Sequence, residues 1–322
     1  MRPLHRMLPV GAGVLSAALL AACSSGTLTS AGTLSKAGQT AAGAAGQAAV
    51  ASGDQYAAYK DTEIYLHGFA GTPSEDPALI AVEDKNEAEL TSRAQLFASL
   101  AKAYASLGNL AGYDASTEFQ GDIQTLFSNI NAYQKAVKQP QVNAKATELV
   151  PPAAGALVGL VQGQMVITAS NQIRQQVVNV IAIMSDPQVR AQFVGTKTYI
   201  VNELALNAET LMQRGLLSPK SYFTAMGQPL GMDVSDDFAA RLKTDKFATQ
   251  GINALVASKV REQVALVGSS YDSSLAALKA LLPLHDKLAA GTPLDLTQID
   301  QIVQQIQTIA AGIAPPSTGA GK

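Results

Sequence analysis

The 322-residue chain contains one cysteine, no tryptophan and three histidines, and only 15 % of its residues are charged. With Cys23 as the sole thiol, the chain can form neither an internal disulfide nor a metal site built on several thiolates. Basic residues number 23 against 25 acidic residues, so no positive excess is available to neutralise phosphates, and nucleic-acid binding is not expected. Alternating runs of β-branched residues, which would indicate strands, are also missing.

Catalytic signatures are equally scarce. The sequence has no Gly-x-Ser-x-Gly nucleophile motif, no phosphate-binding loop and no His-Glu-x-x-His zinc motif. Glu63 and His67 lie four residues apart and could share a helix face, but two ligands do not make a metal site, and His67 is interpreted as a helix-end residue. His285 falls on an apolar helical stripe, which favours a hydrogen-bonded core histidine. We therefore predict no catalytic, cofactor-binding or metal-binding residues, and no cofactor.

Other polar clusters are interpreted in the same way. Acidic residues at 83–89 coincide with a helix start, where they favour the positive end of the helix dipole. The acids at 233–237 lack the spacing of a calcium-binding loop. Three tyrosines, Tyr56, Tyr59 and Tyr65, either line a ligand groove or pack between helices, and packing is the favoured interpretation.

The N-terminal 23 residues carry the most specific signal. Arg2 and Arg6 precede an uncharged run from Leu8 to Ala22. A basic start, a short apolar run and small residues at its end are typical of a secretory leader. The run is shorter than the roughly 20 apolar residues that cross a bilayer.

This leader ends in Leu20-Ala21-Ala22-Cys23, which closely resembles the lipobox of bacterial lipoproteins. The resemblance covers only these residues. It implies cleavage between Ala22 and Cys23, a diacylglyceryl group on the Cys23 sulfur and acylation of the new amino terminus, which together anchor a protein firmly to a membrane. Ser24, which is not Asp, implies the outer membrane in a Gram-negative cell. In a Gram-positive cell the motif implies the outer leaflet of the only membrane.

Behind the anchor, residues 24–53 are Ala, Gly, Ser and Thr with one charge, Lys36. This composition predicts a flexible tether. The stretch 37–51 is also rich in Ala, the strongest helix former. A helix over the second half of residues 24–53 therefore remains an alternative.

Helical periodicity dominates the rest of the chain. Apolar residues recur at spacings of three and four, which indicates one buried face per helix. Pro283 is expected to kink or split the longest pattern. Gly155, Gly159 and Gly163 form a small-residue face suited to close helix packing. The predicted helical segments are 54–67, 86–110, 116–138, 151–184, 186–215, 218–227, 252–288 and a last helix ending near 313.

These patterns predict an all-α fold, an elongated bundle of about six to eight helices behind the tether. The expected organisation is a signal peptide (1–22), lipidated Cys23 and tether (23–53), a helical domain (54–313) and a disordered tail (314–322).

The expected function is that of a non-enzymatic, lipid-anchored protein of the bacterial cell envelope with a helical interaction or scaffold domain. Its expected partners are the membrane, reached through the covalent lipid, and another envelope protein. The alternative is a binding or carrier module that holds an apolar small molecule or lipid between its helices.

Overall fold

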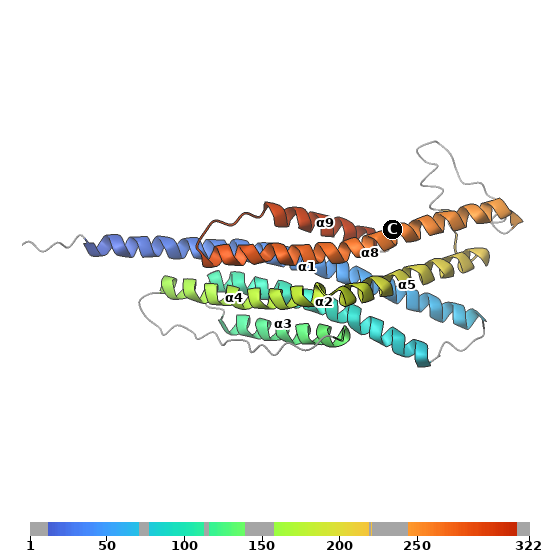
Figure 1. Cartoon of the computed structure of the whole chain (residues 1–322), viewed down its shortest axis with the longest axis horizontal. Helices are drawn as coiled ribbons and strands as arrows, with labels where there is room; N and C mark the ends of the chain where they lie inside the picture. Colours follow the sequence, from blue (N-terminus) through green and yellow to red (C-terminus); the bar gives the residue numbers. More distant parts are fainter. Residues whose placement is uncertain are drawn as a thin grey trace, which may run out of the picture. The chain divides into compact units, whose positions relative to one another are not determined.

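The computed structural model describes residues 12–70, 77–112, 116–138, 158–218, 220 and 244–313. These residues form seven helices and no strand (Figure 1), which confirms the all-α prediction and the predicted number of helices. The predicted tail at 314–322 and most of the predicted short helix at 218–227 lie outside the described residues. The helices are α1 (Ala12–Ala70), α2 (Pro77–Gly112), α3 (Ser116–Ala136), α4 (Val158–Met184), α5 (Pro187–Gln213), α8 (Lys246–Ala289) and α9 (Thr297–Ile313).

Local sequence signals account for several helix ends. α2 and α5 both begin at a proline, a residue suited to the first helical turn because it needs no N–H partner there. Gly215, predicted to end a helix, has a positive φ of 76°. Leu216 N–H donates to the Leu211 carbonyl at 2.9 Å, and Gly215 N–H donates to the Met212 carbonyl at 3.0 Å. This is the Schellman pattern that closes helices on a left-handed glycine.

Of the two alternatives expected at Pro283, a kink or a split, the split is excluded, because α8 runs through this residue as one helix. Proline removes one backbone hydrogen bond from a helix interior. Leu281, Leu284 and Leu288 flank Pro283 and are at most 4 % exposed. Their burial stabilises the helix on both sides of the defect, since packing supplies most helical stability in proteins.

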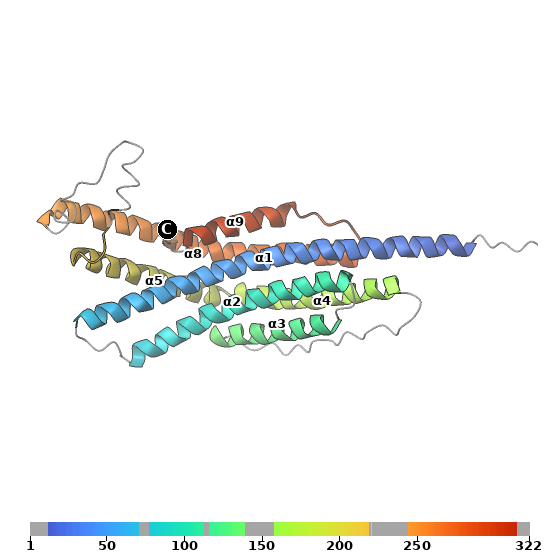
Figure 2. The same ribbon diagram turned by 180° about the vertical axis from the view of Figure 1, so that it is seen from behind.

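The chain divides into two compact units whose segments alternate along the sequence. Unit 1 comprises Met1–Gly46, Ser92–Asp186 and Ser273–Ile306, and unit 2 comprises Gln47–Thr91, Pro187–Asp272 and Gln307–Lys322. Helices α1, α2, α8 and α9 therefore contribute residues to both units. Within unit 1, α3 packs along α4, and the two views of Figures 1 and 2 agree on this arrangement.

The predicted tether at 24–53 is wrong, because these residues belong to α1. In unit 1 the helix buries one face made largely of small residues, including Ala31, Ala41 and Ala42, each at most 1 % exposed. Alanine both favours the helix and lets a neighbouring helix approach closely. A composition that resembles a linker thus serves as a packing surface.

Close helix approach in unit 1 occurs at Gly38 of α1. A Cβ at this position would overlap the ring of Tyr104 on α2, which is fully buried. Beside it, the Ser35 hydroxyl donates to the Tyr104 carbonyl at 2.6 Å. The predicted small-residue face on α4 does not behave in this way at Gly163, where a Cβ would meet no atom within 4 Å.

Unit 2 has its own apolar core. Phe193 on α5 packs against Tyr271 on α8 with ring centroids 5.3 Å apart. Ile309 of α9 is buried with Ala51 of α1 and packs against Leu266 of α8. Helices α1, α5, α8 and α9 therefore all contribute apolar contacts to this unit.

We expect Gly38→Ala to lower the free energy of unfolding by about 1–3 kcal/mol, because the added methyl group must displace a buried tyrosine ring. Denaturant titration followed by circular dichroism measures this change. Gly43→Ala is the matched control: it lies on the same helix, its Cβ would meet no atom within 4 Å, and the gain in helix propensity should stabilise it by up to about 1 kcal/mol. Equal effects of the two substitutions would contradict the close contact.

Candidate functional site

Cys23, the predicted lipid attachment residue, lies within α1, as does the predicted cleavage position after Ala22. Their side chains are outside the part of the chain whose side chains the structure describes. Lipidation therefore stays a prediction from the motif.

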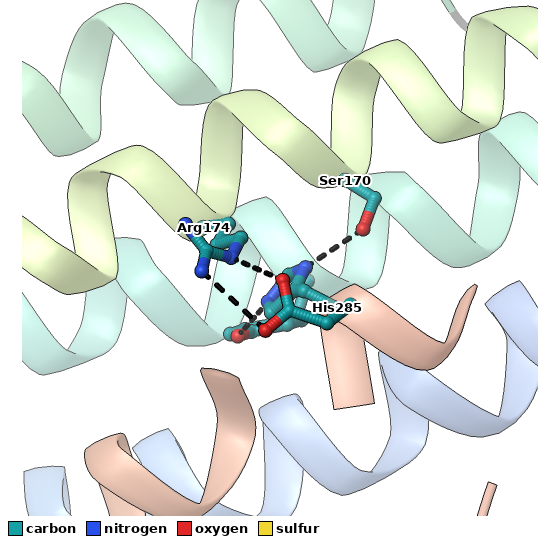
Figure 3. A network of polar contacts seen from close by, with 5 residues as sticks. Ser170, Arg174 and His285 are labelled. Carbon is teal, nitrogen blue, oxygen red and sulfur yellow. Dashed lines mark hydrogen bonds and ion pairs between the residues drawn. The ribbon is translucent and has the colours of Figure 1, made fainter. Parts of the chain in front are cut away.

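The polar centre of unit 1 is the imidazole of His285 on α8. Its Nε2 lies 2.7 Å from the Tyr104 hydroxyl of α2, and its Nδ1 lies 2.7 Å from the Ser170 hydroxyl of α4. Figure 3 shows Ser170 and His285 facing each other, with Arg174 one turn along α4. Arg174 Nε donates to Asp286 Oδ1 at 2.8 Å, next to the histidine.

Burial keeps this imidazole neutral. Removal from water lowers the pKa of His285 to about 3, and the positive charge of Arg174 contributes in the same direction. Burial also raises the pKa of Tyr104, so both groups are uncharged near neutral pH. A neutral imidazole donates from one ring nitrogen and accepts at the other. The hydroxyls of Tyr104 and Ser170 complete both bonds, so the ring is fully satisfied.

A serine hydroxyl next to an imidazole is the arrangement of a nucleophile and its base, but this pair is sealed inside the bundle. Ser170 is 1 % exposed, and His285 and Tyr104 are each 0 % exposed. No described cavity is lined by any of the three. The network therefore joins α2, α4 and α8 rather than meeting a substrate. The interpretation of His285 as a hydrogen-bonded core residue is confirmed.

The Glu63 and His67 pair does lie on one helix face. Glu63 Oε2 is 3.6 Å from His67 Nε2, and Glu63 Oε1 accepts a hydrogen bond from the Asn207 side chain at 2.7 Å. No third acid, histidine or cysteine joins them: across the described residues no group of three or more such side chains could hold a metal ion.

Two of the three tyrosines are buried in unit 2, and the third is exposed. Tyr56 and Tyr59 are buried, with ring centroids 5.9 Å apart, whereas Tyr65 is 51 % exposed. The Tyr56 hydroxyl donates to the Glu83 carbonyl at 2.8 Å. Burial and nearby acids raise the pKa of Tyr56. Tyr56 also borders a polar cavity of about 330 Å³ that includes Lys60.

Sequence reasoning missed a buried lysine. Lys197 on α5 is 0 % exposed and donates from Nζ to the Ser52 carbonyl of α1 at 2.9 Å. A signal was available, because Lys197 falls between Phe193 and Ile200 on the inward stripe of α5. A charge in that register indicates a buried cation with a partner.

The open site of unit 2 is an apolar groove of about 320 Å³. Leu204, Val256 and Val260 follow the apolar periodicity of their helices, which predicts a buried face, but each is only half-buried, and together they line this groove. Periodicity identifies an apolar face and does not say whether another helix covers it. The lining residues are Gln55 from α1, Val201, Leu204 and Ala205 from α5, and Leu255, Val256, Lys259, Val260 and Gln263 from α8.

Comparison with protein-family models, with curated proteins and with solved structures finds no match to this chain. None of the helices in the described ranges combines the length and apolar character needed to cross a membrane.

The depressed pKa of His285 makes stability depend on pH. In the unfolded chain His285 binds a proton below about pH 6.5, whereas the folded protein stays neutral down to about pH 3. Because the unfolded state binds more protons in this window, stability falls as pH falls, by up to about 1.4 kcal/mol per pH unit. Denaturant titrations of the wild type and His285→Gln between about pH 6 and pH 4 measure this difference. A difference that stays constant across the window would contradict the buried neutral imidazole.

Proposed function

We propose that this chain is a non-enzymatic bacterial lipoprotein of the cell envelope, held at a membrane by lipid on Cys23. Its helical body then acts as an interaction or scaffold domain for another envelope protein. The motif Leu20-Ala21-Ala22-Cys23 at the end of a leader-like segment supports the anchor. Ser24 supports an outer-membrane address in a Gram-negative cell.

The distribution of exposed apolar side chains carries the interaction part of the proposal. Within the described ranges, every exposed large apolar side chain belongs to unit 2. Phe247 on α8 is 81 % exposed and Leu206 on α5 is 55 % exposed. Exposed apolar side chains that form a contiguous patch mark interaction sites, and the restriction of these side chains to one unit supports placing such a site there. The set is Val50, Ile64, Tyr65, Tyr199, Leu206, Leu216, Leu217 and Phe247.

The sealed network of unit 1 supports a non-enzymatic role. Ser170 and His285 have the geometry of a nucleophile and its base, but both are buried and out of a substrate's reach. Full hydrogen-bond satisfaction of the imidazole gives these residues a structural role instead.

The anchor is tested by changing Cys23→Ser in a bacterial host supplied with labelled palmitate. We expect label to disappear from the protein and the chain to leave the membrane fraction, because the thiol is the only acceptor for the diacylglyceryl group. Ser24→Asp is the control: it should keep the label and, in a Gram-negative host, move the protein to the inner membrane. A Cys23→Ser protein that still labels and sediments with membranes would overturn the proposal.

The interaction surface is tested by cross-linking in intact cells and capture from detergent-solubilised membranes. Each buried apolar side chain contributes about 1.5–3 kcal/mol to an interface, so Leu206→Ser with Phe247→Ser should reduce partner capture at least about tenfold. Asn202→Ser with Lys246→Ser changes exposed polar residues on the same two helices and should leave capture unchanged. A wild-type protein that captures no partner and is monomeric by light scattering argues against a scaffold role.

The groove of unit 2 favours a second candidate function, a binding module for an apolar molecule. Its volume of about 320 Å³ falls in the range of small-molecule sites, which are mostly apolar with a few polar groups. Six of its nine lining residues are apolar.

A further inference from the structure

Two tyrosines from helices distant in the sequence meet edge to face in unit 2. The rings of Tyr59 on α1 and Tyr199 on α5 have centroids 6.0 Å apart and planes at 76° to each other. Their hydroxyl oxygens lie 3.4 Å apart, a long contact for two hydroxyl groups. The ortho carbons of a tyrosine ring flank the carbon that carries the oxygen. The contact between the oxygens therefore brings together the ring positions at which two phenoxyl radicals couple.

The two rings differ in access to solvent. Tyr199 is 43 % exposed and Tyr59 is 2 % exposed, so an oxidant in solution reaches the first ring and not the second. Burial and the hydroxyl of Tyr199 raise the pKa of Tyr59. Tyr59 therefore keeps its phenolic proton near neutral pH and must release that proton when it loses an electron. The oxygen of Tyr199 lies where it can receive the proton.

Tyr56 is the other aromatic neighbour of Tyr59, and its hydroxyl is held elsewhere. The centroids of these two rings are 5.9 Å apart, but the Tyr56 hydroxyl donates to the backbone carbonyl of Glu83 at 2.8 Å. Tyr199, by contrast, has its hydroxyl next to that of Tyr59. The geometry therefore favours Tyr199 over Tyr56 as the coupling partner of Tyr59.

We propose that Tyr59 and Tyr199 form an oxidative modification site, at which one-electron oxidants convert the pair into a dityrosine cross-link within one chain. Activated haem peroxidases belong to this class of oxidant. The bond joins α1 to α5 inside unit 2. A disulfide cannot make such a connection in this protein, because Cys23 is the only cysteine.

The reaction consumes two equivalents of oxidant. The first equivalent takes an electron from Tyr199, whose phenolic proton passes to water. The Tyr199 radical then takes a hydrogen atom from the Tyr59 hydroxyl, which restores the Tyr199 phenol and leaves the radical on Tyr59. The second equivalent removes another electron and proton from Tyr199. The two radicals join through a carbon–carbon bond between ortho positions, and both ortho hydrogens move to the oxygens, so that two phenols are regenerated.

The test uses the full chain with Cys23→Ser, which leaves no thiol to reduce the radicals, at high dilution. The oxidant is tris(bipyridine)ruthenium(III), generated by light in the presence of persulfate. We expect the monomer to gain dityrosine fluorescence, to lose the mass of two hydrogen atoms and to yield a joined pair of peptides containing Tyr59 and Tyr199. The denaturation midpoint should shift upward, because a bond between residues 140 positions apart restricts the unfolded chain.

Variants that lack single hydroxyl groups assign the site. Tyr199→Phe and Tyr59→Phe should each abolish dityrosine in the monomer, while circular dichroism reports the fold. Tyr65→Phe is the matched control, since Tyr65 is an exposed tyrosine of α1, and it should leave the cross-link unchanged. Tyr56→Phe should leave it unchanged as well.

Three results would overturn the proposal. The first is a cross-link that joins Tyr59 to Tyr56, because the hydroxyl contact would then not select the partner. The second is monomer dityrosine that persists in Tyr199→Phe. The third is a wild-type chain that forms dityrosine only between molecules, or forms none, under conditions that oxidise its exposed tyrosines.

Discussion

The neutral imidazole of His285 fixes how the helices of unit 1 meet. It bonds to two other helices at once, with Tyr104 of α2 on one ring nitrogen and Ser170 of α4 on the other. A buried imidazole that lost either partner would keep an unsatisfied polar atom, which is more costly than the bond itself is stabilising. The register of α2, α4 and α8 is therefore set by a polar requirement as well as by apolar packing. Gly38 adds the steric counterpart, because α1 can lie against the Tyr104 ring only where it has no Cβ.

The two units use their apolar residues differently. In unit 1, none of the described large apolar side chains is exposed, and small residues allow the helices to pack closely. In unit 2, the core around Phe193 and Tyr271 coexists with exposed apolar side chains and with a groove between α5 and α8. Uncovered apolar surface is unfavourable in water, so its concentration in one unit supports the proposal that the interaction surface lies in unit 2.

Sequence patterns predicted where the helices lie better than which of their faces other helices cover. The segment 116–138 was accurate because its apolar residues repeat cleanly, and α3 covers 116–136 of it. The stretch 24–53 was misread because Ala, Gly and Ser are shared by linkers and by closely packed helices, and composition alone does not separate them. Lys197 and the groove illustrate a second limit. Periodicity places a residue on the inward face of its helix. Whether another helix covers that face, and which group bonds a polar side chain on it, depends on segments distant in the sequence.

The continuity of α1 changes how far an anchored body would reach. A flexible coil of residues 24–53 would have a root-mean-square length of about 30 Å and would let the protein sample a wide volume above the bilayer. In α1 the first described buried residue, Ala31, follows Cys23 by a helical rise of only about 12 Å. With lipid on Cys23, the helix would hold unit 1 close to the membrane surface. Unit 1 would then meet other molecules only in a thin layer at the membrane surface. Lateral diffusion in the membrane, rather than motion of a flexible linker, would bring them together.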